Sequence, residues 1–558
     1  MHFQALQQPS FWTELSKDSA RAPLLAHVEK KWEELREDPI PSIPYFDRML
    51  FYKTGDRKKF EMPYFRHRNA LSAVAILALI HPEREDYLAD VQRYLWEICD
   101  EYSWALPAHT KGDPATDPFE LDLFNCETGF AVTEIAHLLR NRLEKAVYER
   151  VKMEVKRRII EPYCVRLTCF DDNFANWAAV CGGNVGGTLM YWDPELFRAQ
   201  LPRILKNMQN FIDGFSDEGI CMEGTTYWIY GFSNFVWFSE MLLHFTNGKI
   251  DLMDSPKVER IAGYMQRSFL KGNTTVSFSD GTRVGRAADE LQYYLTQRFP
   301  QSVHMLPREV SITWDGNVSW IQWTRALLHT PPVDIPRALP TQNYDFPMAA
   351  QTIVHEDAYS LFAKAGNNRE EHNHNDVGSF ILASKNGQVL CDIGAGLYTR
   401  QYFRMTMHER YAILCNSSLG HSVPVINGQP QLFGKQYAGS LRHRENRIEI
   451  EMAKAYGIPE LQSLSRVLCH QADRVELTDS FVGTIHSFTD RFVSFFEPTV
   501  KENEVILADV HIGFDPSQVT LTVHRDSHVN HKGEAETVYL LDFEMTKGVK
   551  CATFVFTF

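Results

Sequence analysis

The spacing of apolar residues changes once along this chain of 558 residues, and that change limits the possible folds most. From about residue 65 to 330, apolar side chains recur every three or four positions, which is typical of amphipathic helices. After a segment with five prolines at 327–348, the spacing becomes two, which is typical of β-strands. We therefore predict a helical part followed by a β part, with a cleft between them as the expected ligand site.

The helical pattern predicts antiparallel helix pairs, and many such pairs in succession suggest a helical toroid or solenoid. The prolines mark a linker at 331–348 between a domain at 1–330 and a β domain, expected to be a sandwich, at 349–558. Helices are expected at 70–80, 91–102, 121–139, 147–160, 194–212 and 227–245. Strands are expected at 359–364, 379–390, 448–452, 474–478, 493–496, 505–510, 519–523, 538–543 and 552–558.

Composition excludes some classes of function. The net charge of −14 argues against nucleic acid as a partner, so an anionic substrate would need a local basic cleft. The ten cysteines form no CxxC pair, which favours buried thiols over disulfides. No signal peptide or membrane span is visible, so we expect a cytoplasmic protein. Prior removal of an export segment would instead indicate a periplasmic or secreted one.

The densest group of polar side chains, His-Asn-His-Asn-Asp at 372–376, lies early in the predicted β part. An apolar run and an Asn386-Gly387 turn follow it. If the segment is extended, His372 and His374 point to one face, on the order of 7 Å apart. Neutral imidazole can act as an acid/base or as a metal ligand near pH 7. The alternative interpretation is a solvated loop before a hairpin.

Two segments of the helical part are also candidates. Asn176-Trp177 precedes a glycine-rich helix start, where backbone or ligand can approach closely; alternatively, Asn176 is a helix N-cap. After a turn at 217–219, Glu223 is followed by Tyr227 and Tyr230, which share a helical face. The alternative for this pair is a stripe of core aromatic residues.

A metal site is a further possibility. Asp392 and His421 are candidates to join His374 as carboxylate and imidazole ligands of a Zn²⁺-type site. The expected hairpin, however, pairs Asp392 with Ile381 and position 374 with Thr399. Only curvature or a changed register would therefore bring Asp392 to His374.

Together these segments resemble the heparinase II/III-like polysaccharide lyases. The resemblance covers about residues 100 to 430, with weaker echoes at 104–109 and 122–128. It rests on five ordered blocks: NFANW at 173–177, MEGTTYWIYG at 222–231, HNHND with GSF at 372–380, CDIGAGLYT at 391–399 and NSSLGHSVPVING at 416–428. The family's fold is α+β and multidomain, with an N-terminal incomplete (α/α) toroid followed by a C-terminal antiparallel β-sandwich domain.

The resemblance implies β-elimination at a uronic acid within an anionic polysaccharide. Asn176 would neutralise the uronate carboxylate, Tyr227 would be the acid and, for some epimers, also the base, and His372 would be the base for the other face. His374, Asp392 and His421 would hold a divalent metal that positions His372. Two nitrogens and one carboxylate favour Zn²⁺ or Mn²⁺, with Ca²⁺ as a further alternative.

The chain also departs from the family's pattern. Several relatives have Asn followed by His where this chain has Asn176-Trp177, which puts its tolerance of different epimers in question. Tyr230 and Asn184 compete with Tyr227 and Asn176 for their roles. A tyrosine base would need its pKa lowered by nearby positive charge. The expected substrate contacts are Trp177, Glu223, Tyr230, His109, Arg400 and Arg404, with Arg410 as an additional cation.

These observations predict a polysaccharide lyase acting on uronate-bearing glycans, with glycosaminoglycans such as heparan sulfate, chondroitin sulfate or hyaluronan as the expected substrates. Alginate or oligoalginate is the alternative substrate. Two other classes stay open: a non-catalytic glycan-binding protein, and a glycoside hydrolase with two carboxylates among Glu127, Asp217 and Glu223. The sequence does not predict the oligomeric state.

Overall fold

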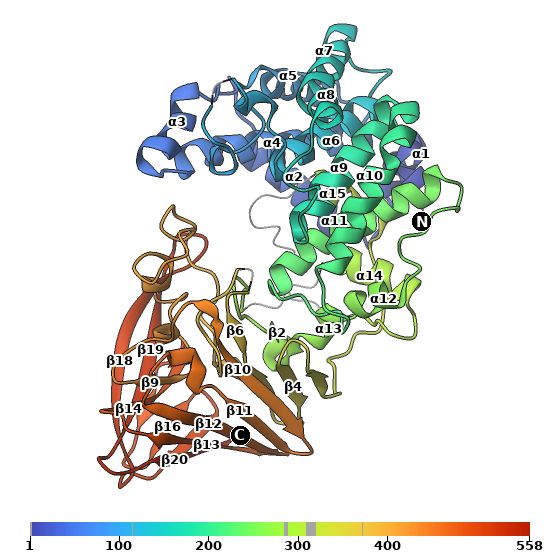
Figure 1. The fold of residues 1–558 in the computed structure, drawn as a ribbon. Coiled ribbons are helices and arrows are strands. Elements are labelled where there is room, and N and C mark those ends of the chain that lie inside the picture. Colours follow the sequence, from blue (N-terminus) through green and yellow to red (C-terminus); the bar gives the residue numbers. More distant parts are fainter. Residues whose placement is uncertain (1–2, 114, 284–287, 308–319, 371) are drawn as a thin grey trace.

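The computed structural model describes residues 3–113, 115–283, 288–307, 320–370 and 372–558. Helices make up the first part of the chain and antiparallel sheets the second, as Figure 1 shows. This confirms the predicted order of a helical part followed by a β part. None of the helices in these ranges combines the length and apolar character that a membrane span requires.

All six predicted helices are present, although one is interrupted. The helix expected at 147–160 stays α-helical only to Val155, and a π-helical turn, Lys156–Ile160, follows it. The helices are α1 Pro9–Leu15, α2 Ala22–Leu35, α3 Tyr45–Thr54, α4 Lys58–Ile80, α5 Glu85–Asp100, α6 Leu123–Leu138, α7 Lys145–Val155, α8 Glu161–Val165, α9 Asn176–Trp192, α10 Pro194–Asp213, α11 Thr225–Phe245, α12 Pro256–Ala262, α13 Tyr264–Arg267, α14 Asp289–Arg298 and α15 Trp320–Leu328.

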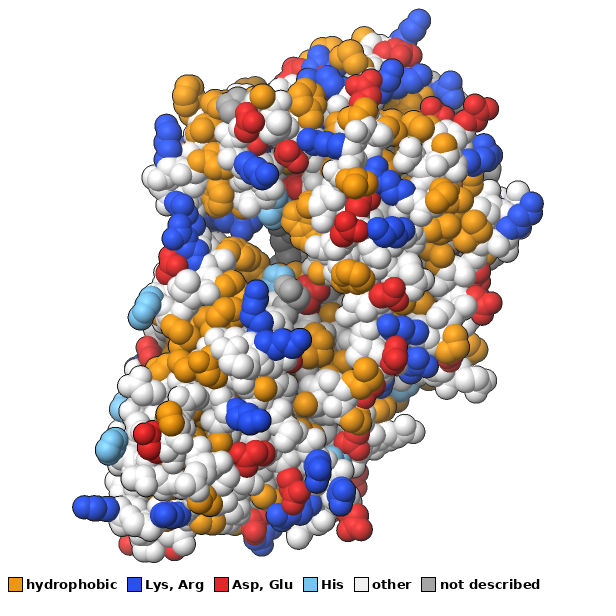
Figure 2. Space-filling model, in the orientation of Figure 1, with side chains coloured by type: hydrophobic (Ala, Val, Ile, Leu, Met, Phe, Trp, Pro, Cys, Tyr) orange, Lys and Arg blue, Asp and Glu red, His pale blue; other side chains and the backbone are white. Residues whose placement is uncertain are grey.

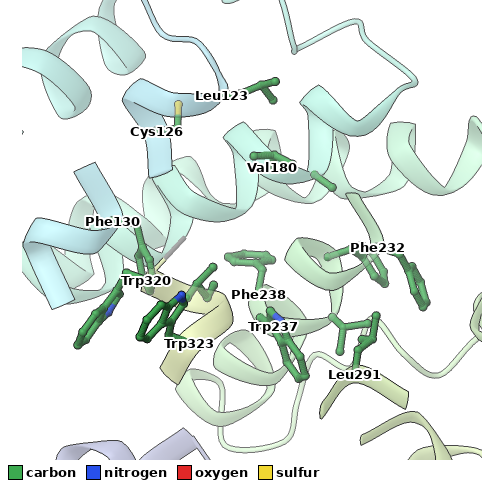
Figure 3. Close-up of a cluster of buried hydrophobic side chains, with 14 of the residues drawn as sticks. Leu123, Cys126, Phe130, Val180, Phe232, Trp237, Phe238, Leu291, Trp320 and Trp323 are labelled. Atoms are coloured by element: carbon green, nitrogen blue, oxygen red, sulfur yellow. The ribbon is translucent and has the colours of Figure 1, made fainter. Parts of the chain in front are cut away.

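Helix α9 packs at the centre of the helical part, between α6, α10 and α11. Its glycines permit this packing. A methyl group at Gly186 would lie 2.5 Å from the Phe238 ring, and one at Gly187 would lie 2.6 Å from the Phe130 ring. Figure 3 shows Phe130 and Phe238 in the buried aromatic cluster around this helix. The glycine-rich stretch therefore serves close helix packing rather than ligand approach.

The β part contains three antiparallel sheets. The five-stranded sheet has the order β3-β4-β5-β7-β8, and the four-stranded sheet has the order β18-β19-β14-β9. The third sheet has nine strands in the order β15-β16-β17-β20-β13-β12-β11-β10-β6. Buried and exposed residues alternate along β12 and β13, so one face of this sheet forms the core of the β part.

The bounds of these strands correct several predictions. The strand expected at 505–510 is a hairpin, because the chain turns at Ala508 with φ 53°. Two long strands, β10 and β12, were not predicted. The strands are β3 Tyr344–Phe346, β4 Gln351–His355, β5 Ser360–Lys364, β6 Gly366–Asn368, β7 Phe380–Ser384, β8 Gly387–Leu390, β9 Pro424–Ile426, β10 Gly434–Arg444, β11 Arg447–Glu451, β12 Leu461–Gln471, β13 Arg474–Gly483, β14 Phe488–Ser494, β15 Thr499–Val500, β16 Glu504–Leu507, β17 Val510–Phe514, β18 Val519–Val529, β19 Ala535–Met545 and β20 Cys551–Thr557.

A segment of the helical part packs on the five-stranded sheet and joins the two parts. It contains a short hairpin, β1 Phe269–Leu270 and β2 Thr274–Thr275. The amide of Lys271 donates to the hydroxyl of Ser360 at 3.1 Å, and the side chain of Gln388 donates to the carbonyl of Thr275 at 2.6 Å. These bonds fix residues 269–283 against the start of the β part. Helix α15 ends at Leu328, and β3 begins within the range expected to be linker.

Candidate active site and metal centre

The polar segment around His372 and His374 is a buried loop and not an extended strand. Strand β7 begins only at Phe380, and His372 has a left-handed backbone with φ 53°, which is uncommon for a residue with a Cβ. The expected geometry, with both histidines on one strand face, is therefore wrong. His374 is fully buried, whereas the side chain of His372 is 24 % exposed.

The register of the following hairpin also differs from the prediction. Ser384 pairs with Gly387, so the turn lies at 385–386, one residue earlier than expected. A bulge between Leu382 and Ala383 shifts the register again. Bulges bend a strand and redirect its side chains. His374 and Asp392 both lie outside the hairpin, since β7 begins at Phe380 and β8 ends at Leu390, and Oδ1 of Asp392 lies 3.9 Å from Nδ1 of His374.

A buried carboxylate from the helical part, Asp280, contacts both histidines of the loop. Its Oδ2 lies 2.7 Å from Nδ1 of His372, and its Oδ1 lies 3.2 Å from Nε2 of His374. Asp280 follows β2 in the segment that joins the two parts. The contacts with His372 and His374 therefore connect the helical part directly to the loop.

Three further side chains from the β part surround the same carboxylate. The hydroxyl of Tyr398 donates to Oδ2 of Asp280 at 2.8 Å, and that of Tyr402 donates to Oδ1. Nη2 of the buried Arg410 lies 3.6 Å from Oδ1. Burial opposes the charged form of Asp280, but the hydrogen bonds from His372 and His374 hold its pKa well below the ordinary value. Asp280 is therefore an anion.

Tyr227, in the first turn of α11, approaches this group from the helical part. Its ring stacks on His372 with 4.2 Å between ring centroids, and its hydroxyl lies 2.6 Å from the hydroxyl of Tyr398. Burial raises the pKa of Tyr227, and the charge of Asp280 adds to that effect. A tyrosine base would need the opposite shift, so the surroundings favour Tyr227 as a proton donor.

Asn176 and Glu223 extend the group along the helical part. Asn176 is the first residue of α9 and not its N-cap, which is Ala175. Its side-chain amide donates to Oε2 of Glu223 at 3.3 Å, and the same oxygen lies 3.5 Å from Nε2 of His372. Residues 176, 223, 227 and 372 thus form one continuous group of contacts between the two parts.

The environment of His372 makes it a stronger proton acceptor. Burial disfavours its charged form, but the hydrogen bond to Asp280 outweighs burial and raises the pKa of His372.

Figure 2 shows the surface hollowed between the helical part and the β part, with histidine side chains reaching the hollow and Lys or Arg side chains bordering it. Such a recess suits an anionic ligand.

The three predicted metal ligands lie together behind the loop. His374, Asp392 and His421 are all buried, and each offers a ligand atom within 4.8 Å of the others. Nδ1 of His421 is 3.2 Å from Oδ2 of Asp392, without an aligned hydrogen bond. Nδ1 of His374 likewise has no hydrogen-bond partner among the described residues.

The hydrogen bonds on the opposite side of each ring show that these residues fit a metal ion. Nε2 of His421 lies 2.9 Å from the carbonyl oxygen of Cys415, and Nε2 of His374 faces Asp280. Since a carbonyl or carboxylate oxygen only accepts, each Nε2 carries the proton and each Nδ1 keeps a lone pair. Both lone pairs and Asp392 face the same point, as metal ligands do.

The competing candidates lie elsewhere. Asn184 is buried in helix packing and donates to the carbonyl of Val180 and to Asn234. Tyr230 is half-buried, and its hydroxyl lies beside Glu127. The side chain of Asp217 is 75 % exposed and pairs with Lys257. Asp217 is therefore a surface residue outside the group of contacts around Glu223.

The remaining predicted substrate contacts fall into two groups. His109 and Trp177 lie together in the helical part, with 5.1 Å between ring centroids, and Nδ1 of His109 is 2.8 Å from Asp122. Arg400 and Arg404 are exposed at the edge of the β part, where Arg404 pairs with Glu409 at 3.2 Å. The buried Arg410 donates to the carbonyls of Tyr402 and Asn373, so it holds the loop.

The sequence reasoning missed Asp280 and Tyr398. Asp280 lies in a Ser-Asp-Gly sequence that reads as an ordinary turn. Tyr398 belongs to the CDIGAGLYT block, which drew attention only through Asp392. The spacing of residues around Asp280 and Tyr398 does not indicate that they meet. They are 118 residues apart in the sequence, and only the tertiary structure brings them into contact.

Residues 339–544 match the family model described as Heparinase II/III-like, C-terminal. The chain therefore carries a heparinase II/III-like C-terminal domain. The loop with His372 and His374, together with Asp392 and His421, lies inside this domain, and the predicted resemblance is confirmed. No curated protein matches the sequence.

Solved structures are similar to nearly the whole chain. The heparan sulfate lyase HepC from Pedobacter heparinus aligns with a TM-score of 0.60 at 14 % identity, covering 97 % of this chain and 88 % of that one. A chondroitin AC lyase of Streptomyces coelicolor A3, in complex with chondroitin sulphate, aligns with a TM-score of 0.56 at 10 % identity, covering 99 % and 82 %. At these identities the likeness concerns the fold, and it confirms the predicted toroid followed by a β domain.

Proposed function

We propose that this protein is a polysaccharide lyase that cleaves uronate-containing polysaccharides by β-elimination. The observation that carries the proposal is the single group of contacts formed by Asn176, Tyr227 and His372 between the helical part and the heparinase II/III-like domain. Glycosaminoglycans are the favoured substrates, because proteins with similar solved structures include a heparan sulfate lyase and a chondroitin AC lyase. Alginate is the alternative.

The elimination breaks the C5–H and C4–O4 bonds of the uronate and forms a C4=C5 double bond. The amide of Asn176 would donate to the uronate carboxylate, because the charge that develops there must be stabilised. Nε2 of His372, which keeps its lone pair, would accept the C5 proton. Asp280 strengthens that acceptor through Nδ1.

The hydroxyl of Tyr227 would donate its proton to the departing O4. Its raised pKa keeps this hydroxyl protonated, as an acid requires. Because the ring of Tyr227 stacks on that of His372, the proposed acid and the proposed base would reach the same uronate unit from adjacent positions. His109, Trp177 and Glu223 line the helical side of the same region and would contact the neighbouring sugar units.

His374, Asp392 and His421 would hold a divalent ion, with Zn²⁺ or Mn²⁺ favoured by two nitrogens and one carboxylate. The ion, when bound, would supply a fixed positive charge that ties these three side chains together. It would thereby support the loop that carries His372, two residues from His374.

A substrate panel tests the proposed reaction. Heparan sulfate, chondroitin sulfate, hyaluronan and alginate are each mixed with the protein, and ultraviolet absorbance follows the unsaturated uronate. We expect absorbance to rise with at least one polymer. Reducing sugar without a new double bond would indicate a hydrolase, and no product from any of the four would overturn the proposal.

A tyrosine pair tests the acid. We expect Tyr227→Phe to lower kcat by at least about 10²-fold, since general acid catalysis contributes 10²–10⁴-fold, with little change in polysaccharide binding. Tyr230→Phe is the matched control, because Tyr230 lies one helical turn later and makes no contact with His372. Equal losses in both variants would contradict the role of Tyr227.

A further inference from the structure

A single carboxylate, that of Asp280, faces the candidate base and a candidate metal ligand at the same time. One oxygen accepts from His372 at Nδ1 and the other from His374 at Nε2. The two imidazoles are therefore bonded through opposite ring nitrogens. This arrangement leaves Nε2 of His372 facing Glu223 of the helical part, at 3.5 Å, and Nδ1 of His374 facing Asp392 and His421.

We propose that Asp280 is a positioning residue that fixes the tautomers of His372 and His374 together and so couples the metal centre to the proton acceptor. The reason is that an ionised carboxylate can only accept hydrogen bonds. Each nitrogen that faces Asp280 must carry a proton, and in the neutral imidazole the opposite nitrogen then offers a lone pair. His372 then presents an acceptor to the sugar, and His374 presents one to the metal.

The surroundings of Asp280 show that its position is fixed from several sides. Tyr398 and Tyr402 donate to its two oxygens, and Arg410 lies 3.6 Å away. Asp280 itself is 2 % exposed. The main chain next to it is fixed on the β part by hydrogen bonds of residues 271–277.

The two hydrogen bonds also join two stretches of chain that lie far apart in the sequence. Asp280 precedes the heparinase II/III-like domain, whereas both histidines lie inside it. Both bonds end on one carboxylate, so a change at Asp280 affects both histidines at once. Metal affinity and proton acceptance should therefore change together when Asp280 is altered.

The test compares Asp280→Asn with Tyr402→Phe. The asparagine removes the anion that both histidines need, because its amide nitrogen donates and cannot accept. The phenylalanine removes one donor to the same carboxylate and leaves both histidine contacts intact. We expect the Kd for Zn²⁺, measured without polysaccharide by competition with a chelating dye, to rise 10- to 100-fold in D280N and less than threefold in Y402F.

A second measurement separates positioning from general damage. With Co²⁺ in place of Zn²⁺, the visible absorption spectrum reports how the ligands surround the ion, and we expect it to change in D280N but not in Y402F. If D280N does not fold, D280E keeps the charge on a longer side chain and is expected to show an intermediate Kd. Wild-type affinity and spectrum in D280N, or equal losses in both variants, would overturn the proposal.

The kinetic part of the proposal rests on the proposed lyase function. The measurements distinguish a failure of the lyase function from a failure of the role of Asp280. We expect D280N to lower kcat by 10- to 100-fold with KM within threefold, and saturating Zn²⁺ should restore less than a tenth of the lost rate. If no polymer is cleaved by the wild type, the lyase function fails while the Zn²⁺ and Co²⁺ measurements still test Asp280. If the wild type is active and D280N keeps its kcat, only the coupling fails.

Discussion

Two of the buried charged clusters in the described β part differ in what they leave unsatisfied. In the first, His374, Asp392 and His421 turn two unprotonated nitrogens and a carboxylate toward one point. In the second, Arg466 binds Asp479 through its Nε and Nη2 atoms and lies 3.8 Å from Asp490. The first cluster can accept a cation, whereas the second already contains one.

The comparison shows that burial and charge alone do not identify a functional site. Arg466 also donates to the carbonyls of Gly378 and Ser422, so its guanidinium is used inside the fold. From strand β12, Arg466 thus ties the residues before β7 and before β9 to Asp479 on strand β13. We interpret the Arg466 cluster as structural and the His374 cluster as a ligand site. The predictions below test that division.

The largest effect is expected from Arg466→Met. This change leaves Asp479 as a buried charge without a cation, and breaking a buried pair in this way costs about 3–5 kcal/mol. All eleven tryptophans precede residue 324, so their fluorescence reports on the helical part and circular dichroism is needed to follow the β part. We expect the urea concentration at the midpoint of unfolding, measured by circular dichroism of the β-sheets, to fall strongly in R466M.

The control for this variant is its Zn²⁺ affinity at low urea, which should stay within threefold of the wild type. A loss of less than about 1 kcal/mol in R466M would show that the cluster is not a structural core. A loss of Zn²⁺ binding in the folded variant would show that the two clusters are not separate.

The next largest effect concerns the open cluster. Zn²⁺ at a hundred times its Kd should stabilise the wild type by about 2.7 kcal/mol, because the ion binds the native state only. His421→Ala removes one of the two nitrogens, and we expect the same Zn²⁺ concentration to stabilise it by less than about 1 kcal/mol. Urea unfolding with and without Zn²⁺ measures both values. Equal stabilisation of H421A and wild type would mean that the ion binds elsewhere.

The two clusters also differ in how far the sequence could reveal them. The change of hydrophobic spacing near residue 330 predicted the helical and β parts, because burial of one face imposes a period on every helix or strand. Residue type made His374, Asp392 and His421 candidates, and the family resemblance grouped them as metal ligands. The expected hairpin register argued against this group, but the hairpin consists only of Phe380–Ser384 and Gly387–Leu390, so it places neither His374 nor Asp392.

Asp280 marks the limit of such reasoning. Its contacts with His372 and His374 span 92 and 94 residues, and no local pattern records a contact between a turn of one domain and a loop of another. The Arg466 cluster was missed for a related reason. Arg466 looks like a surface residue of a polar stretch, and strand β12 was not predicted at all.

A smaller effect, with a defined dependence on pH, is expected from Asp490→Asn. Burial raises the pKa of Asp490 well above its ordinary value, and the neighbouring Asp479 adds to the shift. The folded state therefore keeps a proton that the unfolded state releases above about pH 4. The wild type loses stability as pH rises from there toward the raised pKa, because the unfolded state binds fewer protons.

The asparagine in this variant has no titrating proton, and its amide can still donate to Asp479. We expect D490N and the wild type to differ by about 1 kcal/mol or less at pH 4, with D490N gaining relative stability as pH rises. Urea unfolding at pH 4, 5.5 and 7 measures this trend. A difference that stays constant, or that moves the other way, would show that Asp490 is ionised in the folded protein.

The smallest effect is expected from Arg474→Ala, which sets the baseline for the comparison. Arg474 lies on strand β13, as Asp479 does, and its Nη2 is 2.7 Å from Glu476. Its side chain is 44 % exposed, so water screens this ion pair and solvates either partner when the other is removed. We expect R474A to lose less than about 1 kcal/mol, and still less at 1 M salt. If R474A instead lost as much stability as R466M, removal of any arginine from this sheet would carry the same cost. Burial and ion pairing would then not distinguish a closed structural cluster from an open ligand site.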